Sequence, residues 1–164
     1  MELQPYESAF VVFRRPSAKR KMEGENYPAG QLRLAVSGPW KVTFQDGRGG
    51  PDGPVVFDSL SDWTKSADER IRYFSGEATY MTSFRMKALP AGQTYLNLGR
   101  VMVMAKVMLN GHEVGGVWTR PYRLNITKYL RKGENRLEVT VVNDWMYRLI
   151  HDKSLPEGDR ITWQ

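Results

Sequence analysis

The chain has 164 residues, enough for one domain that buries roughly 70% of its unfolded surface in a single core. With 41% apolar and 12% aromatic residues it is globular rather than disordered, and no apolar run is long enough to cross a membrane. The lack of cysteine excludes disulfide scaffolds and cysteine-bound zinc, and the net charge of +6 is spread as on an ordinary solvated surface, not gathered as on a nucleic-acid-binding face.

The leading segment predicts a short strand followed by a linker. Residues 7–15 (E-S-A-F-V-V-F-R-R) are a β-rich run that is stopped by Pro16. Residues 17–24 are basic and flanked by breakers, which is typical of a linker or an exposed loop. We therefore expect a leading strand and linker from a preceding region over residues 1–22, and one β-sandwich domain over residues 23–164.

Strand-length apolar runs then recur at the spacing typical of a sandwich. They cover residues 31–36, 40–44, 55–57, 71–74, 78–86 and 94–98. The Gly/Pro/Asp-rich residues 46–54 predict a loop, and residues 60–69 predict a short helical or irregular stretch. Residues 126–131 look helical as a single turn, with Thr127 able to cap it.

The clearest signal is a hairpin at Asn110-Gly111. Asn-Gly is a strong hairpin dipeptide because a type I′ turn needs positive φ at both central residues. Alternation places residues 105, 107 and 109 on one face and residues 137, 139 and 141 on one face of a later strand. The sequence therefore predicts an all-β fold, an antiparallel β-sandwich.

The order of these motifs resembles the sugar-binding, galactose-binding-like β-sandwich of glycoside hydrolase family 2, a jelly roll. The matching positions are Trp63-Thr64, Ser75-Gly76, Ala78/Tyr80/Phe84, Asn110-Gly111 with Gly115, Trp118, Pro121-Tyr122, Ile126-Thr127 and Gly133/Asn135/Leu137/Val139. So many positions in the family's order are more specific than any one short motif.

Segments on either side of these motifs narrow the resemblance. Residues 7–15 and residues 143–152 (N-D-W-M-Y-R-L-I-H-D) are similar to the C-terminal region of large α-L-rhamnosidase-like hydrolases of family 106. In those relatives the sandwich is an accessory module that follows a catalytic domain. The resemblance implies a catalytic domain of the same polypeptide as partner, and export of the parent to the periplasm or the cell surface. Because the sequence stops in mid-segment at residues 161–164, we expect a piece of a larger protein.

No catalytic centre is singled out by the sequence. A glycosidase needs two carboxylates about 5 to 9.5 Å apart across the sugar, but most acidic residues here lie in turns or on outward faces, as Glu138 does. His112 and His151 lack metal-ligand spacing. We expect no catalytic residue and no cofactor. Hard oxygen ligands for a structural Ca²⁺ are available in an Asp-rich loop such as the one with Asp46 and Asp52.

Aromatic side chains with polar neighbours mark where a sugar would bind. Pyranose rings stack on Trp or Tyr while Arg, Asn and Asp bind the hydroxyls. One group occupies alternate positions over residues 118–122, and its side chains would share a face if that segment is a strand. A second group follows the last clearly predicted strand and would form a loop at the rim of the sandwich. The candidate carbohydrate-binding residues are Trp118, Arg120, Tyr122, Asn143, Asp144, Trp145, Arg148 and Asp152.

Packing explains the same residues at least as well. Tyr122 beside Pro121 fits a packing corner, and Trp145 and Arg148 fit an inter-domain contact. The aromatic residues expected in the core are Trp40, Trp63 and Tyr80.

These observations favour a non-catalytic accessory module of a glycoside hydrolase that packs on the catalytic domain and contacts oligosaccharide or polysaccharide. Two alternatives stay open, an independent lectin-like carbohydrate-binding module and a self-sufficient glycosidase. We expect no nucleic acid partner and no membrane span. A packing module should expose an apolar patch larger than monomers normally carry, with Met102, Met104 and Trp145 or Trp163 as candidates.

Overall fold

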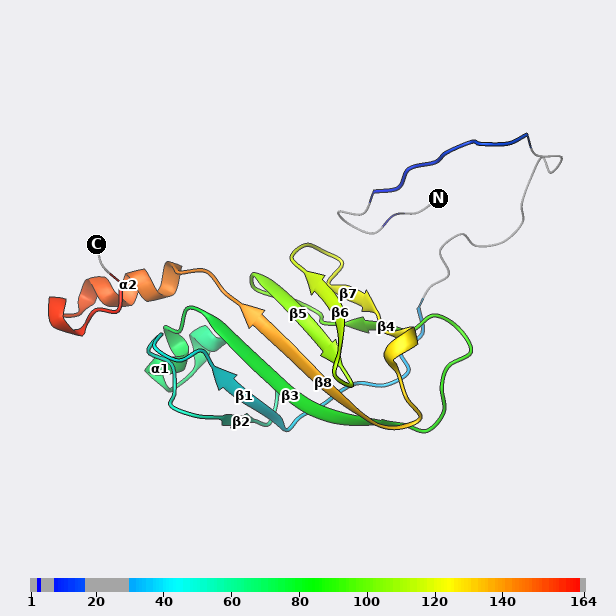
Figure 1. Ribbon diagram of the computed structural model, residues 1–164. Coiled ribbons are helices and arrows are strands. Elements are labelled where there is room, and N and C mark those ends of the chain that lie inside the picture. Colours follow the sequence, from blue (N-terminus) through cyan, green and yellow to red (C-terminus); the bar gives the residue numbers. More distant parts are fainter. Residues whose placement is uncertain (1–2, 4–7, 17–29, 163–164) are drawn as a thin grey trace.

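The computed structural model of the chain is built mainly of antiparallel strands (Figure 1). It describes residue 3 and residues 8–16 and 30–162. Within these residues the strands are β1 (Trp40–Phe44), β2 (Val55–Phe57), β3 (Glu77–Met86), β4 (Tyr95–Asn97), β5 (Met104–Leu109), β6 (His112–Val117), β7 (Arg123–Asn125) and β8 (Gly133–Val142). The helical elements are η1 (Trp63–Lys65), α1 (Glu69–Arg72), η2 (Thr127–Tyr129), α2 (Met146–Ser154) and η3 (Glu157–Asp159).

Six of these strands form one sheet in the order β2-β1-β3-β8-β5-β6, and β4 and β7 form a second, smaller sheet. All of the pairings among them are antiparallel. The predicted all-β, antiparallel class is confirmed.

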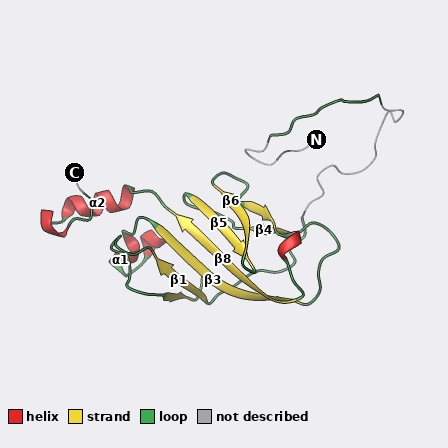
Figure 2. Cartoon of the chain, viewed as in Figure 1, coloured by secondary structure: helices red, strands yellow, loops and turns green. Residues whose placement is uncertain are grey.

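Strands β3 and β8 form the centre of the large sheet. They pair over ten residues each, from Glu77 opposite Val142 to Met86 opposite Gly133, and Figure 2 shows both running along the length of the body. Because side chains alternate along a strand, every second residue faces the core. The buried inward residues of β3, β5 and β8 are Ala78, Tyr80, Ala105, Val107, Leu109, Leu137 and Val139. The faces predicted for β5 and β8 are confirmed.

Aromatic side chains cover one half of the face of the large sheet that points into the core. Trp63 and Phe74 pack on Phe44 of β1, with ring centroids 5.6 and 4.8 Å away. Trp63 Nε1 donates to Tyr80 Oη at 2.5 Å, which gives both polar atoms a partner. Burial raises the pKa of Tyr80 to about 12, although the hydrogen bond from Trp63 acts to lower it. The core positions predicted for Trp40, Trp63 and Tyr80 are confirmed, with Trp63 half-buried.

The small sheet of β4 and β7 covers the other half. Leu96 and Leu124 pack against the core, and Ile126 and Leu130 are buried in it. Strand β7 contacts the edge strand β6 of the large sheet. Because β4 and β7 have three residues each, the second layer of the sandwich is smaller than the first, and a hollow lies between the two covers.

Two asparagines join the β5–β6 turn to the start of β8. Asn110 and Gly111 have φ of 55° and 80°, as the predicted type I′ turn requires. Asn110 Nδ2 donates to Asn135 Oδ1 at 2.9 Å, and Asn110 Oδ1 accepts from the Arg136 N–H at 2.9 Å. Asn135 is fully buried, and its amide both donates to the carbonyl of Arg131 and accepts from the N–H of that residue, each at 2.8 Å. The pair fixes the register of the hairpin against β8.

Two segments predicted as strands have a different structure. Residues 31–36 form no strand, and their leucines are exposed. Residues 71–74 belong to the region of α1, where the Asp68 side chain accepts a backbone N–H of the first turn. A helical turn forms here instead of a strand because residues three apart lie on the same side of a helical turn. Ile71 and Phe74 can therefore both be buried.

A helix follows β8 where the sequence predicted a rim loop. This helix, α2, covers residues 146–154. The predicted cap of the turn after β7 is also wrong, because Thr127 lies inside η2 and its Oγ1 accepts from the Thr94 N–H at 2.8 Å. The side chain of Asn125 accepts the Thr127 N–H instead, at 3.0 Å.

The leading segment has no partner strand within the described part of the chain. Residues 8–16 form no strand there, and Glu7 and the predicted linker over residues 17–24 lie outside the described residues. The apolar side chains of this segment are exposed.

The asparagine pair yields a stability prediction. We expect Asn135→Ala to lower the free energy of unfolding by about 2 kcal/mol or more, since each buried polar group left without a partner costs about 1–3 kcal/mol. The matched control is Glu134→Ala, an exposed neighbour, which should change it by less than about 0.5 kcal/mol. Urea denaturation measures both, and equal effects of the two substitutions would contradict the structural role of Asn135.

Candidate functional site

The two groups of predicted sugar-binding residues leave the sheet at the same end. Val117, the last residue of β6, lies opposite Ala105, and Val142, the last residue of β8, lies opposite Met104. Strand β5 therefore separates the two exits, and neighbouring strands are about 4.8 Å apart. The chain after β6 and the chain after β8 begin about 10 Å from each other.

The first group lies in the loop between β6 and β7. Residues 118–121 form a bend, not a strand, so alternation does not place Trp118, Arg120 and Tyr122 on one face. Trp118 is 69% exposed and Arg120 is exposed, whereas Tyr122 is half-buried against the core. Of this group, Trp118 and Arg120 are available to a partner in solution.

The second group begins with two residues that shape the turn after β8. Asn143 Nδ2 donates to the Phe74 carbonyl at 2.7 Å, and its Oδ1 accepts from the Gly76 N–H at 2.9 Å. Asp144 Oδ1 accepts from the Met146 N–H at 3.2 Å, next to the start of α2. The side chain of Asn143 thus ties the end of β8 to the turn before β3, and Asp144 is exposed.

Arg148 and Asp152 form a buried ion pair on the inward side of α2. Their exposed fractions are 5% and 2%, and an Arg148 Nη2 hydrogen bond to Asp152 Oδ1 joins them. Asp152 Oδ2 also accepts from the N–H groups of Ile161 and Thr162, at 3.1 and 2.7 Å, and from Thr162 Oγ1 at 2.6 Å. Both side chains face the interior and hold the segment after α2 against the helix.

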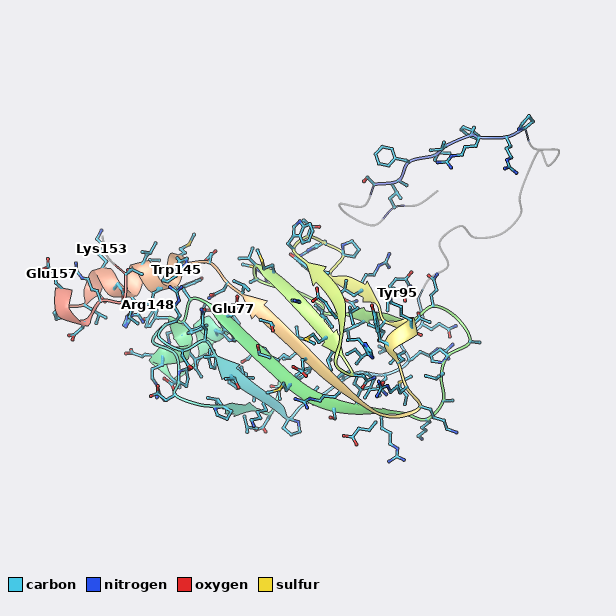
Figure 3. All side chains as sticks on the ribbon, in the orientation of Figure 1. Glu77, Tyr95, Trp145, Arg148, Lys153 and Glu157 are labelled. Carbon is cyan, nitrogen blue, oxygen red and sulfur yellow. The ribbon has the colours of Figure 1, made fainter. Side chains whose placement is uncertain are left out.

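Trp145 contacts the loop between β1 and β2. The guanidinium of Arg48 lies 4.8 Å from the centroid of its ring, a cation–π contact. Further along the helix, His151 stacks on Tyr73 with ring centroids 4.0 Å apart. Figure 3 labels Trp145 at the start of α2, with Arg148 one turn further along. These contacts fix α2 near α1 at the end of the sheet.

The outward side of α2 carries apolar side chains. Met146 and Ile150, four residues apart, are each 60% exposed, and Tyr147 beside them is exposed as well. Residues four apart lie on the same face of a helix. The helix is therefore amphipathic with its charged pair inside and apolar residues outside, the reverse of an ordinary surface helix.

A hollow on the inner face of the sheet has no counterpart among the motifs of the sequence. It has a volume of about 2170 Å³, is open to solvent, and is lined by η1, residues 30–36 and residues 90–103, among others. The aromatic residues that line it are Trp40, Trp63, Tyr80, Phe84, Tyr95 and Tyr147. The charged residues that line it are Arg33, Asp62, Lys65, Arg72, Arg100, Arg123 and Asp144. They come from distant parts of the sequence, so no motif could have indicated them.

The structure gives no support to a metal site. In residues 3, 8–16 and 30–162, no three His, Cys, Asp or Glu side chains come together as a metal site would need. A Ca²⁺ on Asp46 and Asp52 therefore stays a prediction. Across the same residues, no helix has both the length and the apolar character that crossing a membrane requires.

Comparisons with known proteins agree with this architecture. A family model described as the glycosyl hydrolase 2 galactose-binding domain-like domain matches residues 61–162. A rhamnosidase structure from Novosphingobium sp. PP1Y is 40% identical, with a TM-score of 0.81, and the match covers 92% of this chain and 14% of that one.

Two further relatives extend the comparison. A putative β-glucuronidase from Formosa agariphila is 41% identical over 126 residues, which are 75% of this chain and 11% of the relative. A β-glucuronidase from Ruminococcus gnavus, 22% identical over 71% of this chain and 23% of its own with a TM-score of 0.57, shares the fold. The chain thus spans a small part of the length of each of these proteins.

The buried ion pair gives a pH-dependent prediction. Desolvation acts to raise the pKa of Asp152, but hydrogen bonds from Arg148 and Thr162 outweigh it and lower the pKa from 3.8 to about 2. A carboxylate with a lowered pKa stabilises the folded state above its unfolded pKa, and this stabilisation is lost as the pH falls through the folded pKa.

We therefore expect Asp152→Asn to lower the free energy of unfolding at pH 7 by about 3–5 kcal/mol, because it leaves the Arg148 charge buried and unpaired. The difference from the unsubstituted chain should shrink between about pH 4 and pH 2, where Asp152 becomes protonated. Urea denaturation across this range measures it, with exposed Asp159→Asn as the control. A difference that stays constant down to pH 2 would show that the ionised carboxylate is not the stabilising species.

Proposed function

The chain belongs to the glycosyl hydrolase 2 galactose-binding domain-like family, and on that basis we propose that it is a non-catalytic accessory module of a glycoside hydrolase. It packs on the catalytic domain of the same polypeptide. The end of the sheet at which β6 and β8 end then lies near carbohydrate. The parent is of the α-L-rhamnosidase-like type, since a rhamnosidase structure matches 92% of this chain at 40% identity. We further propose that the parent acts in the periplasm or at the cell surface, where polysaccharides are degraded.

The reversed amphipathicity of α2 is the observation that carries this proposal. A helix with two apolar side chains, Met146 and Ile150, each 60% exposed, presents apolar area that an isolated domain would normally bury. The neighbouring end of the sheet adds more, because Met102, Met104 and Trp145 are exposed, as predicted for a packing patch. Trp163, the fourth candidate, lies outside the described residues. In the parent, a neighbouring domain covers this apolar patch.

The leading segment supports a second attachment to the parent. Phe10 and Phe13 are 96% and 92% exposed, and the two valines between them are exposed too. A strand that is apolar on both faces is typical of one buried inside a sheet structure. The rhamnosidase match covers 92% of the chain, whereas residues 30–164 make up about four fifths of it, so the match extends ahead of Gly30. We propose that residues 1–22 are the last strand and linker of the preceding region.

The acidic side chains favour a module without chemistry of its own. Asp62 and Asp68 cap η1 and α1, Asp144 accepts a backbone N–H before α2, and Asp152 holds Arg148. Each of these carboxylates accepts hydrogen bonds that serve the local structure. If the chain were a self-sufficient glycosidase, the purified chain alone would release reducing sugar from an aryl glycoside. We expect no such release.

A lectin-like role is the second candidate, favoured by the exposed indole of Trp118 with Arg120 two residues away. Titration of the chain with oligosaccharides separates the two roles. Millimolar or absent affinity agrees with a packing module, whereas a micromolar Kd that is lost in Trp118→Ala would establish the lectin.

The packing proposal has a direct test in the parent enzyme. We expect the double substitution Met146→Ser and Ile150→Ser to change the free energy of unfolding of this chain by less than about 1 kcal/mol, because both side chains are already in water. In the parent, the same substitutions should lower the thermal midpoint by several degrees, because the apolar contact with the catalytic domain is lost.

Lys153→Ser, an exposed position on the same helix, is the matched control. Thermal unfolding of the chain and of the parent gives all of the values. A parent that tolerates the serine pair as well as the control would show that α2 does not face the catalytic domain.

A further inference from the structure

We propose that residues 31–36 form a movable strap, which closes as a third strand on the free edge of β4 when the parent holds the chain ahead of it. In the closed position, Leu32 and Leu34 of the strap lie on the inner face of the large sheet and fill part of the hollow. This inference rests on the proposed function, because it requires that the preceding region of the parent fixes residues 1–22.

Strand β4 has one edge without a partner. Its other edge pairs with β7, where the Ile126 N–H donates to the Thr94 carbonyl at 2.9 Å. The backbone groups of successive residues in a strand point to opposite edges, so those of Tyr95 and Asn97 point away from β7. No further strand pairs with β4 in the part of the chain that the structure describes. An unpaired edge of this kind is a template for another strand.

The free edge of β4 faces the hollow. Strand β7 contacts β6, which is the last strand of the large sheet on that side. Residues of β4 line the hollow together with Phe84, Leu137 and Val139, which belong to the central strands β3 and β8. The unpaired side of β4 is therefore turned toward the middle of the large sheet, at the point where the small sheet ends.

The strap already lies beside the chain that leads into β4. Residues 30–36 line the hollow, and Arg33 and Leu34 also line a second, smaller hollow with residues 85–91, which lead from β3 toward β4. In Figure 1, the light-blue segment that contains the strap runs from the β4 end of the body to the start of β1. Closing therefore needs only a short movement.

The end of the strap next to β1 is anchored, whereas its start is exposed. Val36 packs against the core, and the Pro39 carbonyl that follows accepts from Thr82 Oγ1 at 3.1 Å. Leu34 is 42% exposed and Leu32 is 86% exposed, so contact with the body decreases toward the start of the strap. The first residues of the strap are thus the part that moves.

The residue pattern of the strap fits this position. In a strand, Leu32, Leu34 and Val36 share one face, and Arg33 and Ala35 share the other. With the apolar face on the hollow, the arginine stays in water. Burial of two leucines favours the closed position, and loss of backbone freedom opposes it.

The preceding region of the parent shifts this balance. A segment with one free end loses the conformational freedom of every residue that it orders. A segment held at both ends has already lost part of that freedom, so ordering it costs less. The strap is therefore open in the isolated chain, as in the structure, and closed in the parent. The preceding region thus controls how much of the inner face of the sheet a ligand can reach.

Hydrogen–deuterium exchange, read by mass spectrometry with electron-transfer fragmentation, tests the inference at β4. We expect the amides of Tyr95 and Asn97 to exchange at least about tenfold more slowly in the parent than in the chain, because they donate to the closed strap. Equal exchange in the chain and the parent would overturn the inference.

Two pairs of substitutions in the parent separate the strap from any other cover of β4. Leu32→Ser with Leu34→Ser should restore the fast exchange, because the strap loses its apolar face. The matched control is Arg33→Ser with Ala35→Ser, at exposed positions on the other face, which should leave the exchange slow. Protection that survives the leucine substitutions, or an equal loss in the two pairs, would contradict the strap.

The strap and the packing role fail separately. The serine substitutions at Met146 and Ile150 should leave exchange at β4 unchanged, because they lie on α2 and not on the strap. A parent that shows no protection of β4 still reports the packing of α2 through its thermal midpoint.

Discussion

The ion pair between Arg148 and Asp152 is the buried contact that joins α2 to the segment that follows it. Burying two charges is costly unless hydrogen bonds satisfy them. Here Asp152 accepts from Arg148, Ile161 and Thr162 and so anchors the chain that follows the helix. Leu149 of the same helix is half-buried, whereas Met146, Tyr147 and Ile150 are exposed. The same contacts that stabilise the helix therefore create the surface for a partner.

The rest of the fold is a rigid support for that end of the sheet. The long β3–β8 pairing delivers Asn143 to the turn before β3, where its amide holds the Phe74 carbonyl and the Gly76 N–H. The Asn110–Asn135 pair fixes the opposite end of β8. Both ends of this strand are therefore held by buried or half-buried amides.

Much of the sheet could be predicted because its signals are local. Alternating residues in β5 and β8 and the Asn110-Gly111 turn act through the two-residue period of a strand and the backbone freedom of glycine. Helix α2 could not be predicted from its residue pattern. Its buried residues are Arg148 and Asp152, whereas the usual pattern of an amphipathic helix places apolar residues on the buried face. Residues 31–36 alternate like a strand, yet no strand forms there, because alternation does not supply a partner strand.

The candidate sugar-binding residues could likewise be predicted only where the signal is local. The exposure of Trp118 agrees with a sugar-facing aromatic, but burial of Arg148 and Asp152 is a tertiary property that residue type alone does not reveal. The hollow is lined by residues from distant parts of the sequence, which no local pattern indicates. Packing of α2 on the catalytic domain is tested most directly by the rate at which dilute peroxide oxidises Met146, in this chain and in the parent enzyme. We expect fast oxidation in the chain and strong protection in the parent, and equal rates in the two would contradict the packing of α2 on the catalytic domain.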